Sequence, residues 1–123
     1  MKHTTILFVD DDADIRRAVS DGLTEKGYKV ITADGGLTAL NLLETIIPNL
    51  IITDLRMEPM NGFDFYQTVK NNKKFQDIPC FFLTAISDPL AEKYSHDLGV
   101  DSYLIKPIDL DELDLVIRTK LKI

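Results

Sequence analysis

The chain has a single cysteine and no tryptophan among its 123 residues. One cysteine excludes a disulfide within the chain, and the position of Cys80 in an apolar run predicts a small buried side chain. No apolar run approaches the roughly 20 residues that a transmembrane helix needs. The chain enters its first predicted strand at Ile6, so no signal peptide is expected. A reducing, cytoplasmic setting without membrane insertion is therefore predicted.

Basic residues are fewer than acidic residues. The chain has 14 Lys and Arg residues against 20 Asp and Glu residues, which gives a net charge of −6. Direct nucleic-acid binding is not expected, because such domains usually carry basic patches. The same charge disfavours docking on an anionic membrane. A Gly-rich phosphate-binding loop is missing, which argues against nucleotide hydrolysis of the P-loop type.

Apolar runs and amphipathic stretches alternate along the chain. The predicted strands are Ile6–Val9, Tyr28–Thr32, Leu50–Thr53, Cys80–Leu83 and Ser102–Ile105. The predicted helices are Asp12–Lys26, Thr38–Ile47, Phe63–Lys70, Leu90–Leu98 and Asp109–Leu121. Short buried strands alternating with helices indicate a parallel sheet. We predict one domain over residues 1–123, an α/β flavodoxin-like, doubly wound, five-stranded parallel sheet in the order 2-1-3-4-5 with helices on both faces.

Apolar spacing predicts the buried faces of the second and fourth helices but leaves the end of the third undecided. The second has Leu40, Leu43 and Ile47 on one face, and Leu90, Tyr94 and Leu98 mark the fourth. The pattern does not fix the C-terminus of the third helix, which could end at Lys70 or continue to Phe75. Apolar residues at this spacing are typical of amphipathic helices.

Polar residues that could bind ligands or take part in a reaction follow four of the predicted strands. Asp10 and Asp11 follow the first strand, Asp54 the third, Thr84 the fourth and Lys106 the fifth. In the predicted order these four strands are contiguous, and ligands of open α/β sheets bind at the carboxyl ends of the strands. Three carboxylates, a hydroxyl and an ammonium are therefore expected to meet, a combination that suits a divalent cation and a phosphoryl group.

The carboxylates predict a magnesium site. Three carboxylates in one crevice repel one another, which raises their pKa values unless a cation joins them. Mg²⁺ prefers hard oxygen ligands and keeps several waters, so Asp10, Asp11 and Asp54 suit it. The acidic run after the first strand, taken alone, reads more simply as a solvated loop whose Asp11 or Asp12 caps the next helix. Asp54 on another strand end favours the metal site.

The remaining candidates suit phosphoryl chemistry. A carboxylate such as Asp54 can attack phosphorus and form an acyl phosphate. Lys106, held extended by the following proline, can reach a phosphoryl oxygen as a point charge, and the Thr84 hydroxyl can donate to another. Each residue alone has a plainer interpretation, as a turn residue, a surface lysine or a strand residue. Tyr103 reads either as a core aromatic or as a side chain that reports the state of the site. The isomer of the Lys106–Pro107 bond stays open.

Four motifs together resemble the receiver domain of bacterial two-component response regulators. They are Val9–Asp12, Thr53–Asp54 with Gly62 eight residues later, Leu83–Ala85 and Tyr103–Pro107. Each motif is weak alone, but all four occur in order and at the family's spacing. The resemblance covers the chain from Thr5 to the last helix.

The resemblance implies a role for each candidate. Asp54 would accept a phosphoryl group from the phosphohistidine of a histidine kinase or phosphotransfer protein. Asp10, Asp11 and Asp54 would bind Mg²⁺ together with the backbone carbonyl of Arg56, with Asp10 acting through water. Thr84 and Lys106 would hold the phosphoryl oxygens, and Tyr103 would turn inward after phosphorylation. The protein would be a phosphoacceptor signalling domain, not a conventional enzyme.

One loop departs from the family pattern. Such domains usually carry Met-Pro three and four residues after the acceptor, whereas Met57 is followed here by Glu58 and then Pro59. Glu58 could add a carboxylate near the metal, and a binding module that works without phosphorylation stays open. An aspartyl phosphatase is the weakest alternative, because no residues remain for a cap.

Further implications concern turnover and partners. In the family, the positions of Arg56 and Ile86 influence dephosphorylation, and we hypothesise that these side chains hinder the attacking water. The resemblance also implies a partner kinase and a downstream target or output domain. The family also allows a phosphorylation-dependent homodimer through the fourth helix, fifth strand and fifth helix, for which these residues alone give no support.

Overall fold

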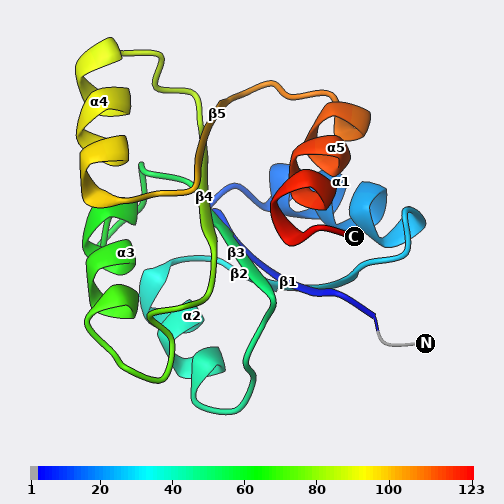
Figure 1. Cartoon of the computed structure of the whole chain (residues 1–123), viewed down its shortest axis with the longest axis horizontal. Coiled ribbons are helices and arrows are strands. Elements are labelled where there is room, and N and C mark those ends of the chain that lie inside the picture. The colour runs from blue at the N-terminus through cyan, green and yellow to red at the C-terminus, as the bar shows by residue number, and fades with distance from the viewer. Residues whose placement is uncertain (1–2) are drawn as a thin grey trace.

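Five parallel strands form one sheet in the order β2-β1-β3-β4-β5, and five helices alternate with them along the chain (Figure 1). The computed structural model describes residues 3–123, so the first two residues of the predicted leaderless start lie outside the described part. The strands are β1 Thr5–Val9, β2 Lys29–Ala33, β3 Leu50–Thr53, β4 Cys80–Thr84 and β5 Ser102–Ile105. The helices are α1 Ala13–Glu25, α2 Gly36–Leu43, α3 Gly62–Lys70, α4 Pro89–Leu98 and α5 Leu110–Leu121. The predicted flavodoxin-like architecture is confirmed.

The sheet register aligns the carboxyl ends of the strands. Val9 pairs with Thr53, so the residues that follow β1 and β3 lie side by side. Thr84, the last residue of β4, pairs with Ile105, the last residue of β5. Lys106, which follows β5, therefore lies just beyond the end of β4. Every residue of β3 and β4 is buried, which explains their continuous apolar character.

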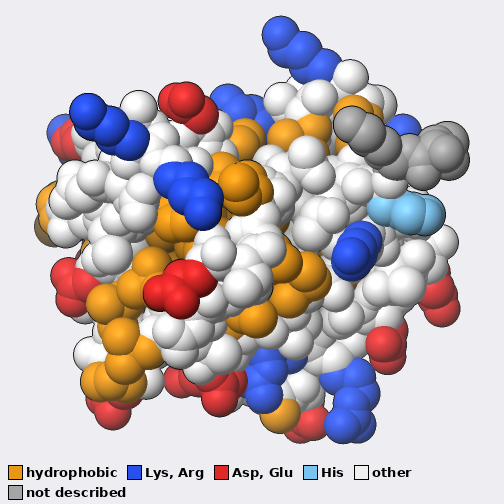
Figure 2. Space-filling view, turned by 90° about the horizontal axis from the view of Figure 1, so that it is seen from below, with side chains coloured by type: hydrophobic (Ala, Val, Ile, Leu, Met, Phe, Trp, Pro, Cys, Tyr) orange, Lys and Arg blue, Asp and Glu red, His pale blue; other side chains and the backbone are white. Residues whose placement is uncertain are grey.

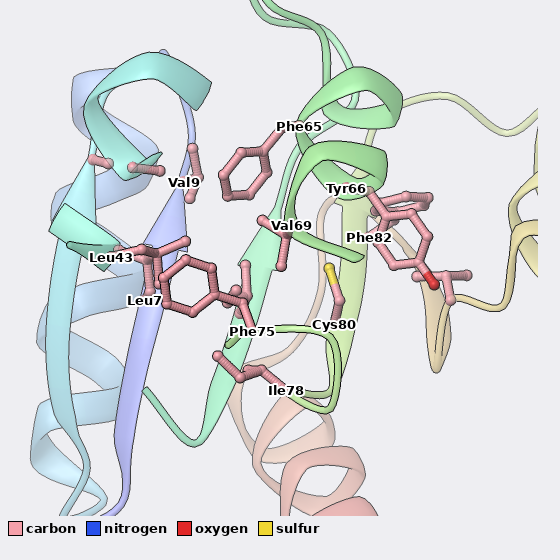
Figure 3. Close-up of a cluster of buried hydrophobic side chains, with 14 of the residues drawn as sticks. Leu7, Val9, Leu43, Phe65, Tyr66, Val69, Phe75, Ile78, Cys80 and Phe82 are labelled. Carbon is pink, nitrogen blue, oxygen red and sulfur yellow. The ribbon is translucent and has the colours of Figure 1, made fainter. Parts of the chain in front are cut away.

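Helices cover both faces of the sheet, with α1 and α5 on one side and α2, α3 and α4 on the other (Figure 1). Figure 3 shows the core on the second side, where Phe65 and Val69 of α3 lie near Leu7 and Val9 of β1. The opposite core joins side chains of the sheet to α1 and α5. Full burial of one such side chain stabilises the fold by about 1.5–3 kcal/mol.

Side-chain caps set the start of four helices. The caps are Asp12 for α1, Asn61 for α3, Asp88 for α4 and Asp109 for α5, and each accepts hydrogen bonds from backbone amides of the first turn. Such caps satisfy amides that have no partner within the helix. The predicted starts at Asp12 and Asp109 are confirmed.

The second helix differs from its prediction at both ends. It begins at Gly36 and ends at Leu43, whereas Thr38–Ile47 was expected. The amide of Thr45 donates to the carbonyl of Leu42 at 3.0 Å, three residues back, which closes the helix with a tighter turn. Ile47 is 60% exposed and lies beyond the helix, so its predicted place on the α2 face is wrong.

Two other helices also refine the expectations. The third helix ends at Lys70, and turns follow up to Ile78, so a helical continuation to Phe75 is wrong. Phe75 is nevertheless buried from that turn. The fourth helix is confirmed, but Leu90 is 75% exposed, and the ring of Tyr94 packs edge-on against Phe63 with half of the side chain exposed.

Surface charge is mixed. Figure 2 shows a face on which apolar side chains gather between single acidic and basic groups, with no continuous basic patch among the described residues there. Within residues 3–123, no helix has both the length and the apolar character that crossing a membrane requires.

Candidate functional site

The sheet places all four predicted strand-end groups at one edge. The amide of Asp54 donates to the carbonyl of Val9 at 3.0 Å, which extends the β1–β3 ladder by one residue. The amide of Lys106 donates to the carbonyl of Thr84 at 2.8 Å, which does the same for β4 and β5. Because the backbone at each strand end is tied to its neighbour, the side chains leave the sheet from fixed positions.

Carboxylate oxygens of Asp10, Asp11 and Asp54 lie within 4.8 Å of one another. Asp10 is completely buried and Asp54 is 7% exposed, whereas Asp11 faces solvent. Two buried carboxylates and one exposed carboxylate thus form a site that suits a cation with oxygen ligands, such as Mg²⁺. The predicted convergence of the three acids is confirmed.

Lys106 joins the two buried acids. Its Nζ lies 2.6 Å from Oδ2 of Asp10 and 2.8 Å from Oδ2 of Asp54. Burial lowers the pKa of the Lys106 ammonium, but its hydrogen bonds and ion pairs with both acids outweigh burial, so the pKa is raised. Lys106 is therefore a resident positive charge at the centre of the site.

Asp10 is held at both carboxylate oxygens. Oδ1 accepts the amide of Asp12 at 2.9 Å, and Oδ2 accepts Lys106. Burial raises the pKa of Asp10, while the Lys106 hydrogen bond and the Asp12 amide oppose the rise without cancelling it. Both oxygens of Asp10 are therefore engaged by the protein, and the residue is buried from solvent.

Asp54 has a different environment. Its Oδ1 accepts the amide of Leu55 at 2.6 Å and, at a longer 3.4 Å, that of Arg56. Its Oδ2 accepts Lys106. These contacts fix the orientation of the Asp54 side chain at the end of β3.

A glycine supports the loop that carries Asp54. A Cβ added at Gly62 would lie 2.2 Å from the carbonyl oxygen of Asp54 and 2.8 Å from Cα of Leu55. The amide of Gly62 also donates to the carbonyl of Leu55 at 2.9 Å. The close approach of two backbone segments explains why the motif has a glycine eight residues after Asp54.

Thr84 and Tyr103 meet at the loop after β4. Thr84 is buried, and its Oγ1 accepts the amide of Ile86 at 3.3 Å. The Tyr103 hydroxyl donates to the carbonyl of Ile86 at 2.7 Å, and its ring packs edge-on against Phe82. Tyr103 thus lies inward in this structure, as a core aromatic. The resemblance implied that Tyr103 turns inward only after phosphorylation, whereas the side chain is already buried in this structure of the unmodified chain. A dependence of its contacts on phosphorylation stays a prediction.

An open crevice of about 540 Å³ lies beside the acids. Its lining residues come from the segments that follow β1, β3 and β4 and from the start of α3, and they are Asp11, Leu55, Arg56, Met57, Glu58, Asn61, Phe63 and Ile86. Glu58 lines this crevice but does not belong to the cluster of three close carboxylates. The peptide bonds before Pro59 and Pro107 are cis.

Comparison with known proteins agrees with this geometry. The family described as response regulator receiver domain matches residues 6–118, nearly the whole chain. The chain belongs to this family. It is a receiver domain of two-component response regulators, a class of signalling proteins that interact with histidine kinases and output domains.

Relatives and solved structures extend the match. The receiver domain is 37% identical over 122 residues to the probable transcriptional regulator ycf27 of Porphyridium aerugineum, covering 99% of this chain and 50% of that protein. It is 33% identical over 118 residues to the response regulator Rre1 of Synechocystis sp., covering 95% of this chain and 51% of that protein. The chain thus spans about half the length of these relatives.

The chemotaxis response regulator CheY4 of Vibrio cholerae is a structural neighbour. It superimposes with a TM-score of 0.89 and 30% identity, covering 96% of this receiver domain and 98% of that chain. The fold and the family therefore agree along nearly the entire described length.

Sequence reasoning missed one polar residue beside the receiver domain's acids. Nη1 of Arg16 in α1 donates to the backbone carbonyl of Asp10 at 2.6 Å. An arginine on the first turns of a helix usually reads as a surface charge. Its spacing of six residues from Asp10, across a loop and one helical turn, was the available signal.

Proposed function

We propose that this receiver domain is a phosphorylation switch in which Asp54 accepts a phosphoryl group from the phosphohistidine of a histidine kinase or phosphotransfer protein. The observation that carries the proposal is the position of Lys106 Nζ, within 2.8 Å of Asp54 and 2.6 Å of Asp10, beside a third carboxylate. A nucleophile, a positive charge and acids for a cation share one pocket, which positioning and electrostatic catalysis of phosphoryl transfer require.

Magnesium fits the donor set of this pocket. Three carboxylates supply hard oxygen atoms within 4.8 Å, and Asp11, the most exposed, is able to receive a hydrated ion. We assign Asp11, Asp54 and the backbone carbonyl of Arg56 as direct ligands and Asp10 as a ligand through water. When bound, Mg²⁺ neutralises charge on the acids and on the phosphoryl oxygens.

The transfer can be written with this chain's residues. A carboxylate oxygen of Asp54 attacks phosphorus in line, the bond from phosphorus to the donor nitrogen breaks, and the partner's imidazole keeps that electron pair and takes a proton. Lys106 moves from the carboxylates to a phosphoryl oxygen, and Thr84 donates its hydroxyl hydrogen to another. Attack of water on phosphorus later returns the Asp54 carboxylate and releases phosphate. The domain thus assists its own reaction and acts as a signalling protein.

A small apolar crevice beside Lys106 supports docking of the phosphodonor. It has a volume of about 200 Å³ and lies between α1 and the segment after β5, lined by Ile15, Ala18, Val19, Leu83, Lys106, Pro107 and Ile108. An apolar side chain next to the partner's phosphohistidine would fill it while the histidine faces Asp54. Burial of that apolar surface would stabilise the complex.

The output side rests on coupling through Ile86. Because the Thr84 hydroxyl and the Tyr103 hydroxyl both bond Ile86, a shift of Thr84 toward a phosphoryl group would alter the contact that holds Tyr103. Phosphorylation would then change the balance of two arrangements at α4, β5 and α5. A downstream target, an output domain or a second copy of the chain would read that surface.

Three further assignments belong to the same proposal. Residues 1–123 act as one receiver unit, in a cytoplasmic setting. The domain itself makes no direct contact with nucleic acid or membrane, in keeping with its net charge of −6. A phosphorylation-dependent homodimer is one form that the output could take.

One observation favours a second function, a binding module that works without phosphorylation. The loop Met57–Met60 departs from the family pattern, and Glu58 lines the crevice beside the acids. In that case the site would bind Mg²⁺ poorly and would not accept a phosphoryl group. The two functions therefore differ in a direct measurement.

The test is incubation with acetyl phosphate and Mg²⁺, followed by intact-mass measurement. We expect the wild-type chain to gain the mass of one phosphoryl group and Asp54→Asn to gain none. Asp34→Asn, which alters an exposed aspartate after β2 outside the cluster, is the matched control and should behave as wild type. An unmodified wild type, or equal gains in wild type and Asp54→Asn, would overturn the proposal.

A further inference from the structure

Arg16 links helix α1 to the acidic loop. Its Nη1 donates to the carbonyl of Asp10 at 2.6 Å, and its backbone amide donates to the carbonyl of Asp12 at 3.0 Å. One residue therefore holds the loop from both sides of Asp11. The Arg16 side chain is half-buried, whereas the neighbouring Arg17 is exposed.

The carbonyl that Arg16 contacts is buried. Asp10 is 0% exposed, and the chain leaves the sheet at this residue, so its carbonyl does not continue the strand ladder. In residues 3–123, the donor that reaches this carbonyl is Arg16. A buried carbonyl that loses its donor is costly, so the backbone or water would rearrange to satisfy it.

Asp11 depends on this backbone for its position. Among the described residues, no hydrogen bond or ion pair holds the Asp11 carboxylate, unlike the carboxylates of Asp10 and Asp54. Its distance from Asp54 is therefore set by the loop itself. Hydrogen bonds from Asp12 and Arg16 fix that loop.

We propose that Arg16 is a positioning residue of the cation site, which keeps the Asp11 carboxylate in reach of the ion by pinning the carbonyl of Asp10. This inference rests on the proposed function of the acidic pocket. It assigns Arg16 no contact with the ion or the phosphoryl group.

The proposal has a signature that separates it from a nearby positive charge. A cation near the pocket repels Mg²⁺, so removal of the charge alone would tighten binding. Loss of a positioning residue weakens binding, because the ligand no longer sits where the ion needs it. The sign of the change in Mg²⁺ affinity therefore decides between the two roles.

The test is an equilibrium titration with Mg²⁺ alone, in which backbone amide NMR signals report binding. The proteins compared are wild type, Arg16→Met, Arg16→Lys and the matched control Arg17→Met. We expect Arg16→Met to raise the Mg²⁺ dissociation constant about tenfold, the lower range of outer-shell effects on metal sites. Arg16→Lys should fall between wild type and Arg16→Met, because one donor and the charge remain. Arg17→Met should stay within about twofold, since exposed charges are screened by salt.

A second readout uses phosphorylation by acetyl phosphate. Raised Mg²⁺ should return the rate of Arg16→Met close to that of wild type, because the variant lacks affinity and not chemistry. Equal or tighter Mg²⁺ binding by folded Arg16→Met, or an equal loss in Arg17→Met, would overturn the inference. Should Arg16→Met fail to fold, Arg16→Lys with wild-type affinity would overturn it as well. If wild type itself bound no Mg²⁺, the proposed function would fall, and this inference with it.

Discussion

At the level of single residues, Ile86 stands at the border between turnover and signalling. Its side chain lines the crevice beside the acids, while its amide and carbonyl bond Thr84 and Tyr103. The backbone contacts do not depend on the side chain. A substitution at Ile86 therefore tests access of water to the site while leaving the Tyr103 contact in place.

We predict that Ile86→Ser shortens the lifetime of phosphorylated Asp54 several-fold. A small polar side chain would open the crevice to water and could orient it toward phosphorus, whereas isoleucine excludes it. Loss of the phosphoryl group would be followed by intact mass after removal of acetyl phosphate. Ile47→Ser, at an exposed position beyond α2, is the control. An unchanged lifetime in Ile86→Ser would remove the hypothesis that this side chain slows dephosphorylation.

Cys80 supplies a prediction on pH. It is 1% exposed, and burial raises the pKa of its thiol to about 12 from a reference of 9.0. At pH 8 and below the thiol is mostly protonated in both folded and unfolded chains. As pH rises from 9 toward 12, the unfolded chain releases the proton and the folded chain keeps it, so the free energy of unfolding falls.

Urea unfolding of wild type and Cys80→Ala between pH 8 and pH 10.5 would measure this effect. At pH 8 the variant should be less stable by about 1 kcal/mol, because a buried group is lost. The difference should shrink as pH rises, since the variant lacks the thiol. Tyr66, whose pKa burial raises to about 12, titrates in both proteins, and only the smaller part of its shift that comes from Cys80 differs between them. A stability difference between wild type and Cys80→Ala that stays constant from pH 8 to pH 10.5 would refute the raised pKa of Cys80.

Among the secondary-structure elements, the start of α3 controls the loop that carries Asp54. A Cβ at Gly62 would overlap backbone atoms, which cannot rotate away. At Gly22, inside α1, a Cβ would instead meet the end of the Leu110 side chain, which can change rotamer. The two glycines therefore form a matched pair.

We predict that Gly62→Ala lowers the free energy of unfolding by about 2–3 kcal/mol, as overpacking does in a rigid setting. The displaced loop should also slow phosphorylation of Asp54. Gly22→Ala should cost less and leave the phosphorylation rate unchanged. Thermal unfolding and acetyl phosphate kinetics would measure both. A fully active, stable Gly62→Ala would contradict the close approach described here.

The elements also show what sequence patterns can and cannot predict. Buried parallel strands are nearly all apolar, so β3 and β4 and the polar residues that follow them could be located directly. The end of α2 could not, because Ile47 continues the helical spacing but lies exposed after a tight turn. The exposure of Leu90 on α4 is likewise a tertiary property that helical spacing does not reveal.

The site follows the same division. Convergence of Asp10, Asp54 and Lys106 follows from strand order and could be predicted. The double ion pair of Lys106 depends on how far each side chain reaches, which spacing along the chain does not determine. The contact of Arg16 with the Asp10 carbonyl depends on the angle at which α1 leaves the loop, and sequence patterns carry no measure of that angle.

For the domain as one cooperative unit, a cation that binds only the folded pocket must stabilise the entire fold. At Mg²⁺ concentrations of 100 times the dissociation constant, the expected gain is about 2.7 kcal/mol. Thermal unfolding of wild type should therefore shift upward with Mg²⁺. Asp11→Asn should lose most of the shift, and Asp34→Asn should keep it. Equal shifts in all three proteins would show that Mg²⁺ acts outside this pocket.

The most direct measurement is a crystal structure with Mg²⁺ and beryllium trifluoride, which mimics the phosphoryl group. We predict the mimic on the Asp54 carboxylate, with Lys106 Nζ and Thr84 Oγ1 on its fluorines and the ion held by Asp11, Asp54 and the Arg56 carbonyl. Lys106 would then have left the position that it now shares between Asp10 and Asp54. A mimic bound elsewhere, or a Lys106 that stays on Asp10 while Asp54 carries the mimic, would contradict the proposed switch.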